Sequence, residues 1–398
     1  MSEWKKVKLG DCCLKIGSGS TPKGGSTVYV ESGTSLIRSQ NVYNLSFDYN
    51  GLTHITEDAA NKLKGVTIFD DDILLNITGD SVARTCIVPN DVLPARVNQH
   101  VAIVRADCKK INSRFLNYYL ASPRMQAHML SLAVGKGASR NAMTKQMIEN
   151  FEVPCPPLEI QHRIASILSR YDSLIENYQK QIKLLEEAAQ RLYKEWFVDL
   201  HFPGHENTKI VDGVPEGWEK KKLVDMVDVQ YGYAFDGKLF NSNREGMPIL
   251  RIRNIPDGTT SDYTTEEVSK DYIVHNGDIV VGMDGIFHIN SWSGGDAYLV
   301  QRACSFRPKK AELKGFIFQA IQEPIKFFEK TLVGATVAHL GKKHIDSIEL
   351  CVPKNFEFYQ PFSMFYNQRQ GLLSQIRLLT EARDRLLPKL MSGEIEIV

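Results

Sequence analysis

The chain has 398 residues, a formal net charge of +1, 43% hydrophobic residues and 24% charged residues, values that are typical of a globular protein with room for two domains. No apolar run reaches the length of a membrane span and the N-terminus lacks a signal-peptide core, so we expect a cytoplasmic protein without membrane contacts. Seven cysteines without a Cys-x-x-Cys pair argue against a disulfide framework and against a structural zinc site.

Residues 1–155 are predicted to form a first mixed α/β domain. Short apolar runs bounded by Gly, Asp, Asn and Pro predict strands at 35–39, 68–77, 85–88 and 97–104. Apolar residues at helical spacing predict a helix over 113–132, and a short helix is expected over 144–150.

Residues 156–202 are predicted to form one long helix. Apolar residues recur at alternating steps of three and four on a single narrow stripe, which is typical of a coiled-coil seam and requires a partner helix. A helix over 156–197 would be about 60 Å long at about 1.5 Å per residue, although a buried core helix is the alternative interpretation. The seam residues expected here are Ile164, Ile167, Tyr171, Leu174, Tyr178, Ile182 and Leu185.

Residues 203–353 repeat the landmarks of the first domain in the same order. Leu36-Ile37-Arg38 with Asn41 corresponds to Ile249-Leu250-Arg251 with Asn254, and Asp72 and Arg105 correspond to Asp278 and Arg307. The loops between these landmarks differ. The repeat predicts one frame that carries two different surfaces.

Residues 354–398 are predicted to form the partner helix, with Leu372, Ile376, Leu379 and Leu386 in its seam. Glu187-Ala188 in the first long helix recurs as Glu381-Ala382 in the second. The predicted fold class is therefore α+β, with two similar domains separated by two long helices that form an antiparallel intramolecular coiled coil with pseudo-twofold symmetry.

Motifs for catalysis are missing from the sequence. It has no phosphate-binding loop of the Gly-x-x-x-x-Gly-Lys-[Ser/Thr] type, and no Asn-Pro-Pro-[Tyr/Phe] tetrapeptide of the kind used by amino-methyltransferases. The glycine-rich segment 17–25 lacks the βαβ context of a dinucleotide site. We expect no enzymatic activity, no bound metal and no cofactor in this chain.

Polar residues beside the predicted strands favour DNA binding instead. Arg and Lys can bind guanine edges, Asn and Gln adenine edges, and basic groups can hold phosphates. In the first domain the candidates are Ser20, Thr21, Lys23, Arg38, Gln40, Asn41, Arg84, Arg96, Asn98, Gln99, Lys136, Arg140 and Asn141. In the second domain they are Tyr231, Tyr233, Arg251, Arg253, Asn254, Gln301, Arg302, His339, Lys342 and Lys343.

Five short segments carry a resemblance to a known family: Ile16-Gly17-Ser18-Gly19-Ser20-Thr21-Pro22, Pro156-Pro157-Leu158-Glu159-Ile160-Gln161, Trp196-Phe197-Val198-Asp199, Val214-Pro215-Glu216-Gly217-Trp218 and Leu386-Leu387-Pro388-Lys389-Leu390-Met391-Ser392-Gly393. They resemble the specificity subunits of type I restriction-modification systems, the HsdS family. They cover nearly the whole chain in the family's order. The second long helix departs from the pattern, because it opens with Pro353-Lys354-Asn355-Phe356.

The resemblance implies a non-catalytic subunit with two target-recognition domains, each binding half of a split double-stranded DNA sequence. It implies two methyltransferase subunits as partners, which would use S-adenosylmethionine, and in a restriction enzyme two restriction subunits that use ATP and Mg. The alternatives are the specificity subunit of a type IIB or IIG modification enzyme, a fused methyltransferase or nuclease, and a coiled-coil adaptor for proteins.

Overall fold

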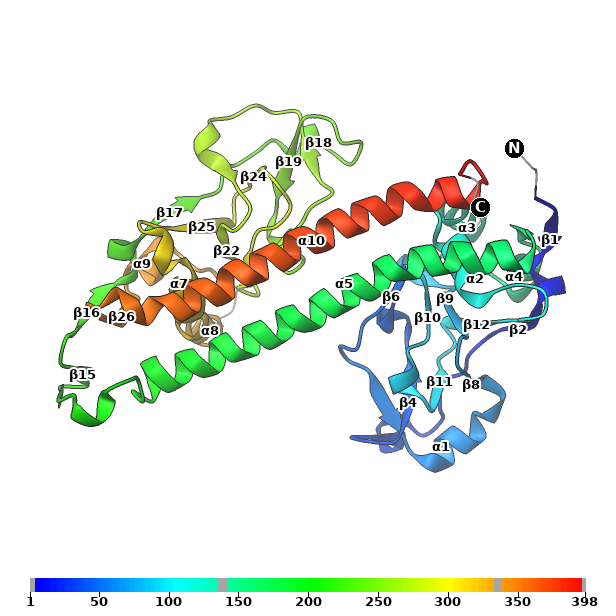
Figure 1. Cartoon of the computed structure of the whole chain (residues 1–398), viewed down its shortest axis with the longest axis horizontal. Helices are drawn as coiled ribbons and strands as arrows, with labels where there is room; N and C mark the ends of the chain where they lie inside the picture. Colours follow the sequence, from blue (N-terminus) through cyan, green and yellow to red (C-terminus); the bar gives the residue numbers. More distant parts are fainter. Residues whose placement is uncertain (1–3, 135–141, 333–337, 396–398) are drawn as a thin grey trace. The chain divides into compact units, whose positions relative to one another are not determined.

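The computed structural model describes residues 4–134, 142–332 and 338–395, which fall into two compact units. Unit 1 consists of residues 1–175 together with 379–398, and unit 2 consists of residues 176–378. Each of the two long helices therefore contributes one end to each unit (Figure 1).

The strands of unit 1 form two main sheets. The antiparallel four-stranded sheet has the order β10 (Thr85–Ile87), β9 (Ile73–Asn76), β12 (Val101–Ala106) and β2 (Cys13–Ser18). The five-stranded sheet has the order β3 (Tyr29–Val30), β7 (Thr53–Ile55), β4 (Thr34–Ile37), β11 (Ala95–Val97) and β8 (Thr67–Ile68), in which β4 and β11 run parallel. Shorter pairs join β1 (Lys6–Lys8) to β13 (Glu152–Pro154), and β5 (Val42–Tyr43) to β6 (Ser46–Phe47).

The two inner strands of the four-stranded sheet of unit 1, β9 and β12, are buried on both faces, which explains their nearly continuous apolar sequences. Successive side chains of a strand point to opposite faces. Ile73 and Leu75 pack with the helices, whereas Leu74 packs with residues of the five-stranded sheet such as Ile37 and Val97. Unit 1 is thus built of a helical layer, a middle sheet and a second sheet.

The helical layer of unit 1 contains α2 (Ser113–Ala121), α3 (Pro123–Ala133) and α4 (Lys145–Glu149), and α1 (Glu57–Lys62) packs beside the five-stranded sheet. The single helix predicted over 113–132 is wrong, because Ser122 is extended and Pro123 starts a new helix. The strand predicted over 68–77 is also two strands, β8 and β9, separated by a turn at Asp71, where φ is positive.

Unit 2 repeats this topology strand for strand. Its four-stranded sheet has the order β23 (Ile289–Ser291), β22 (Ile279–Gly282), β25 (Ala303–Pro308) and β17 (Val227–Tyr231). Its five-stranded sheet has the order β18 (Phe240–Asn241), β20 (Tyr263–Thr264), β19 (Met247–Leu250), β24 (Ala297–Leu299) and β21 (Ile273–Val274), with β19 and β24 parallel. The duplication predicted from the landmarks is confirmed at the level of sheet order.

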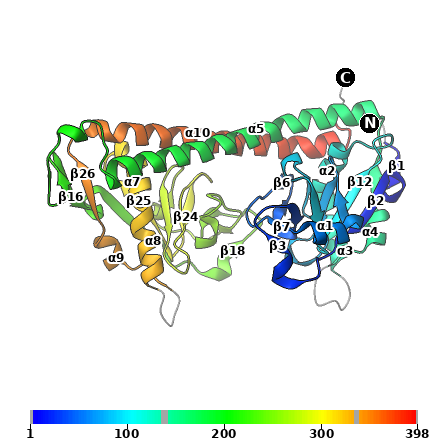
Figure 2. The same ribbon diagram turned by 90° about the horizontal axis from the view of Figure 1, so that it is seen from below.

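A further strand pair of unit 2 also has a counterpart in unit 1, whereas a hairpin before it has none among the described residues. The pair β16 (Trp218–Lys222) and β26 (Glu349–Pro353) matches β1 and β13, and a hairpin of β14 (Ile210–Val211) and β15 (Val214–Pro215) precedes it. The helices are α6 (Leu223–Met226), α7 (Lys314–Ala320), α8 (Gln322–Thr331) and α9 (Lys342–Asp346) (Figure 2). None of the helices in the described ranges combines the length and apolar character that crossing a membrane requires.

Both units have an Asp in the turn that precedes an inner strand of the four-stranded sheet, β9 in unit 1 and β22 in unit 2. Asp72 is fully buried, accepts a backbone hydrogen bond from Phe69 (2.8 Å), and both its oxygens accept from the Arg105 guanidinium at 2.7 Å. Asp278 accepts a backbone hydrogen bond from His275 (3.0 Å), and its carboxylate lies 3.9 Å from Arg307. The repeated Asp and Arg of the sequence are therefore parts of the frame.

The two long helices are α5 (Leu158–Tyr193), which continues as a π turn to Val198, and α10 (Gln360–Met391). In unit 1, Asp172 of α5 pairs with Arg383 of α10 at 2.8 Å, and Ile164 shares a core with Leu390. The start of α5 therefore lies beside the end of α10 in unit 1 (Figure 1).

In unit 2, Glu186 of α5 pairs with Arg369 of α10 at 2.6 Å. Further along α5, the ring of Tyr193 contacts that of Phe362. The helices are thus antiparallel within each unit.

The predicted seam is only partly buried. Ile164 is buried, whereas Leu174 is 43% exposed, and Ile175, one position further along, is the buried residue. The successive four-residue steps after Leu174 shift the apolar stripe by one position, so our placement of Leu174 in the seam is corrected to Ile175. The other predicted seam residues are half-buried: Ile167, Tyr171, Tyr178, Ile182, Leu185, Leu372, Ile376, Leu379 and Leu386.

Candidate nucleic-acid interface

A three-residue turn follows the central strand of the five-stranded sheet in both units. In unit 1 the backbone N–H of Arg38 donates to the Asn41 side-chain oxygen (3.0 Å), and in unit 2 that of Arg251 donates to the Asn254 oxygen (2.9 Å). An Asn in this position satisfies a backbone donor that the turn leaves without a partner. The repeated Arg and Asn of the sequence thus mark the same turn twice.

Three predicted DNA contacts in unit 1 are corrected because their side chains are buried. Asn41 is fully buried and also donates to the carbonyl of Asp48 (2.9 Å). Arg96 is 9% exposed and donates to the carbonyls of Ala60 (3.1 Å) and Ala95 (2.9 Å), and burial lowers the pKa of its guanidinium. Asn98 is 8% exposed and accepts from the backbone N–H of His100 (3.1 Å). These groups hold loops in place.

The end of β2 meets the turn between β11 and β12 at very short range. A Cβ added to Gly19 would lie 2.1 Å from the carbonyl oxygen of Val97, so only glycine fits. The N–H groups of Gly19 and Ser20 donate to the carbonyls of Val101 (2.9 Å) and Val97 (3.0 Å). Within the glycine-rich segment 17–25, Gly19 is therefore required for strand packing.

This close approach gathers five polar residues, the unit 1 cluster: Ser20, Thr21, Thr78, Gln99 and His100. The Thr21 hydroxyl donates to the Gln99 side-chain oxygen, and the Thr78 hydroxyl and His100 Nδ1 are 2.6 Å apart. Ser20, Thr21 and Gln99 are exposed, and their hydroxyl and amide groups carry no charge. Such hydroxyl and amide groups are suited to hydrogen bonding with base edges and sugar-phosphate oxygens.

The equivalent place in unit 2 carries different chemistry. A Cβ on Gly232 would lie 2.1 Å from the Val300 carbonyl oxygen, so the backbone approach is the same as in unit 1. Here the unit 2 cluster consists of Tyr233, Asp284, Gln301, Arg302 and His339. Asp284 pairs with Arg302 (3.2 Å) and with Nδ1 of His339 (2.6 Å).

Within the unit 2 cluster, Arg302 has an uncommon backbone conformation. Its φ is 73°, a left-handed conformation that is uncommon for residues other than glycine. Other residues share a positive φ, among them Asp71 in the acidic turn, so this conformation places Arg302 in a tight turn and does not by itself mark a ligand site.

The other predicted residues of unit 1 are spread over several loops, and Arg38 and Gln40 belong to the turn after β4. The Arg38 guanidinium and the Gln40 amide both donate to the carbonyl of Gly51, at 2.7 and 3.3 Å. Arg84 lies over the ring of Tyr43, with 4.5 Å between its guanidinium carbon and the ring centroid. Lys23 is exposed in the loop after β2. The predicted Lys136, Arg140 and Asn141 lie outside the described residues.

In unit 2, the predicted residues of the turn after β19 are partly engaged. Arg253 forms a two-pronged pair with Asp262 (2.7 and 3.2 Å), and the Arg251 guanidinium lies over the ring of Phe240. Arg253 nevertheless keeps 59% of its side chain exposed.

Tyr231, Lys342 and Lys343 lie near the other predicted residues of unit 2. Tyr231 is half-buried, and burial raises the pKa of its hydroxyl to about 12. Lys342 and Lys343 are exposed at the start of α9, next to His339. The described residues hold no group of three or more His, Cys, Asp or Glu side chains that could bind a metal ion.

Sequence reasoning missed Thr78 and Asp284, which complete the two clusters. Both belong to the turn after the central strand of the four-stranded sheet, and each is followed by a glycine with positive φ, Gly79 or Gly285. The two glycines are matched in the repeat, so the residues before them could have been found as the variable part of a repeated turn.

Two units with one backbone frame and two different exposed polar clusters define a class of protein with duplicated recognition domains on paired helices. Residues 1–187 and 215–360 match the family model described as the type I restriction modification DNA specificity domain. The chain therefore belongs to this family.

Relatives of known name support the same assignment along the whole chain. The specificity subunit of the type I restriction enzyme MjaIX of Methanocaldococcus jannaschii is 25% identical over 419 residues, which cover 99% of this chain and 94% of the relative. The MjaVIII specificity subunit of the same organism is 26% identical over 356 residues, covering 84% of this chain and 81% of the relative. The crystal structure of the S subunit of a type I system from M. genitalium has the same fold, with a TM-score of 0.56, 14% identity and coverage of 99% and 96%.

Proposed function

We propose that this chain is the DNA sequence-specificity subunit of a type I restriction-modification system. The observation that carries the proposal is the duplicated frame with unlike clusters, in which unit 1 exposes hydroxyl and amide groups and unit 2 exposes an Arg302–Asp284 ion pair. Side chains of different chemistry at equivalent places select different bases. The target would be a bipartite and asymmetric sequence in double-stranded DNA, with one half-site per domain and with the domains at 1–155 and 203–353.

The long helices would hold the two recognition domains at a fixed spacing, and the chain itself would catalyse nothing. Methylation would come from two methyltransferase subunits that use S-adenosylmethionine, and cleavage from restriction subunits that use ATP and Mg. The family match and the names of the relatives support these partners. One base pair corresponds to about 3.4 Å along DNA, so the helices would fix the length of the non-specific spacer.

The test is methylation mapping with the chain and its methyltransferase subunit in a host without other adenine methylation. Single-molecule sequencing should show one split motif. Replacing residues 1–155 by the equivalent segment of a relative should change one half of the motif and leave the other half intact. A change in both halves, or methylation without a motif, would contradict the proposal.

A further inference from the structure

The turn after β19 in unit 2 carries Arg251 and Arg253, and it is held from outside its own sheet. Asn290 of β23 donates from its amide to the carbonyls of Ile255 and Pro256, both at 2.9 Å. These two carbonyls belong to the residues that directly follow the turn 251–254. We call residues 251–254 the unit 2 recognition turn. Asn290 therefore fixes where this turn lies on the surface.

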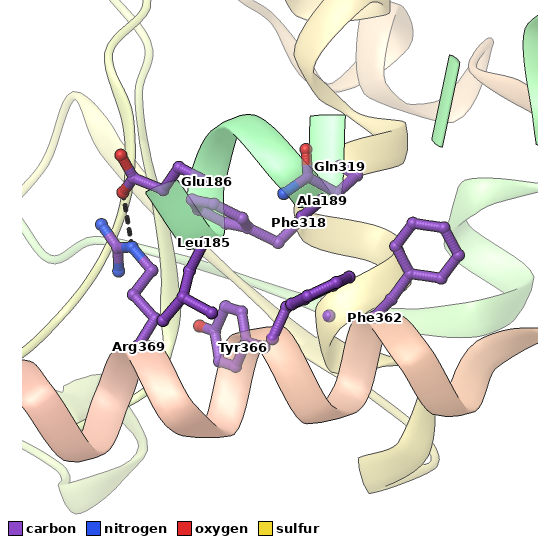
Figure 3. A pocket seen from close by; sticks show the side chains of 10 residues that line it. Leu185, Glu186, Ala189, Phe318, Gln319, Phe362, Tyr366 and Arg369 are labelled. Carbon is purple, nitrogen blue, oxygen red and sulfur yellow. Dashed lines mark hydrogen bonds and ion pairs between the residues drawn. The ribbon is translucent and has the colours of Figure 1, made fainter. Parts of the chain in front are cut away.

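Asn290 is in turn held by a buried arginine of the long helix α10. Nη2 of Arg369 donates to the Asn290 side-chain oxygen at 2.9 Å, and Nη1 donates to the Ser291 hydroxyl. The third nitrogen, Nε, donates to Glu186 of α5 at 2.6 Å (Figure 3). One guanidinium thus connects both helices to the strand that supports the recognition turn.

The surroundings of Arg369 leave it little freedom. Its side chain is 9% exposed, and its guanidinium carbon lies 5.4 Å from the centroid of the Phe318 ring. Tyr366, one turn earlier on α10, donates to the carbonyl of Gly277 at 3.0 Å. A buried arginine with all three nitrogens engaged keeps a single geometry, because each lost contact would leave a desolvated charge.

Unit 1 supports its equivalent turn in a different way. Asn76, at the end of the central strand β9, donates to the carbonyls of Ser39 (2.8 Å) and Val42 (3.3 Å). The equivalent position in unit 2 is Gly282, where an added Cβ would lie 2.9 Å from the Ile252 side chain. Unit 2 therefore has no room for an asparagine on its central strand.

The other inward-facing arginine of α10 makes no such connection. Arg383 in unit 1 donates to Asp172 of α5 (2.8 Å) and to its neighbour Asp384, and Asp172 accepts from the Tyr118 hydroxyl of α2. None of these contacts reaches residues 38–42. Arg383 thus offers a matched control, since it forms the same kind of interhelical ion pair without touching the bonds that hold a recognition turn.

We propose that Arg369 is a positioning residue for the unit 2 recognition turn. It places Asn290, and through Asn290 the Arg251 and Arg253 backbone, so that the half-site bound by unit 2 is read only while α5 and α10 are paired. The proposal rests on the proposed function, with double-stranded DNA as the ligand. Discrimination between bases in the half-site of unit 2 should then depend on the pairing of α5 with α10. Discrimination in the half-site of unit 1 should not depend on it.

The experiment measures methylation rates of the complete methyltransferase complex on duplexes with the cognate motif or with one mismatch in either half-site. A mismatch typically lowers binding by roughly 5- to 150-fold. With Arg369→Met, this discrimination should fall by about tenfold in the half-site assigned to unit 2 by segment replacement, and it should stay unchanged in the other half-site. Arg383→Met should leave discrimination in both half-sites unchanged.

Asn290→Ala serves as the second variant, because it cuts the connection but keeps the Glu186–Arg369 pair. It should give the same one-sided loss even if Arg369→Met does not fold by circular dichroism. Unchanged discrimination in folded Asn290→Ala, or an equal loss in both half-sites with either variant, would overturn the proposal. A wild-type complex without any sequence preference would instead overturn the proposed function.

Discussion

The two clusters differ in charge although the backbone beneath them is the same. Unit 1 presents Ser20, Thr21 and Gln99, whereas unit 2 presents Tyr233, Gln301 and an Arg302–Asp284 ion pair at 3.2 Å. Both units have a glycine beneath the cluster, because a Cβ added to Gly19 or to Gly232 would lie 2.1 Å from a carbonyl oxygen. In this protein the frame is therefore set by buried and conformationally demanding residues, and exposed side chains are left to vary.

The largest expected effect comes from breaking the frame at its acidic turn. Asp72→Asn should destabilise unit 1 by about 3–5 kcal/mol, because it leaves the Arg105 guanidinium half-buried without a carboxylate. Asp278→Asn should destabilise unit 2 by only about 1 kcal/mol, since Arg307 lies 3.9 Å away. Native-state hydrogen exchange of the amides of β9 and of β22 measures the stability of each unit separately. Equal losses would contradict the difference that we see between the two ion pairs.

The next effect tests the close approach beneath each cluster. Gly19→Ala should destabilise unit 1 by about 1–3 kcal/mol and abolish recognition of its half-site, because the new Cβ would lie 2.1 Å from the Val97 oxygen. Gly17→Ala is the control, since a Cβ there meets nothing within 4 Å. Thermal unfolding and methylation mapping provide the two measurements. A Gly19→Ala protein that behaves like Gly17→Ala would show that the approach is not needed.

Single substitutions in the two clusters should change the salt dependence of DNA binding to different extents. Arg302→Ala should weaken DNA binding by about 1–3 kcal/mol and lower the slope of log affinity against log salt by roughly one. Gln99→Ala removes a neutral group, so it should weaken binding without changing the slope. Fluorescence anisotropy of the complex at several salt concentrations measures both quantities. A similar fall in slope for both variants would remove the charge contrast between the units.

The smallest effect concerns pH and is confined to unit 2. His344 Nδ1 accepts from the backbone N–H of Gly341 (3.0 Å), and the equivalent position in unit 1 is Met147. Partial burial, with Lys343 and His339 nearby, lowers the pKa of His344 below its ordinary 6.5. The unfolded chain then binds the proton more readily, so stability should fall slightly as pH drops below 6.5 and level off below the folded pKa.

His344→Met should remove this part of the pH dependence and leave unit 1 unaffected. Hydrogen exchange of α9 and α4 between pH 5 and pH 7 compares the two short helices directly. A pH dependence of α9 that survives the substitution would assign it to another group.

The sequence was sufficient to predict the duplicated sheets and the long helices, because buried positions repeat and helical stripes are long. It was insufficient for the interface. Asn41 and Arg96 have side chains that can bind bases, but here they bind the backbone, and burial depends on neighbours far away in the sequence. The pairing of Asp284 with Arg302 and His339 was also not predictable, since these partners are distant in the chain. Long-range pairing of polar groups leaves no periodic pattern.

The ion pairs of the long helices have a consequence for what each helix can bind. Asp172 and Glu186 both lie on α5, and their partners Arg383 and Arg369 both lie on α10. When Glu187-Ala188 of α5 is aligned with Glu381-Ala382 of α10, Arg383 aligns with Ala189 of α5 and Arg369 aligns with Ile175 of α5. Two copies of α5 paired in this way would set each acid against an apolar residue. The helices of this duplicated chain are therefore complementary to each other and not to themselves.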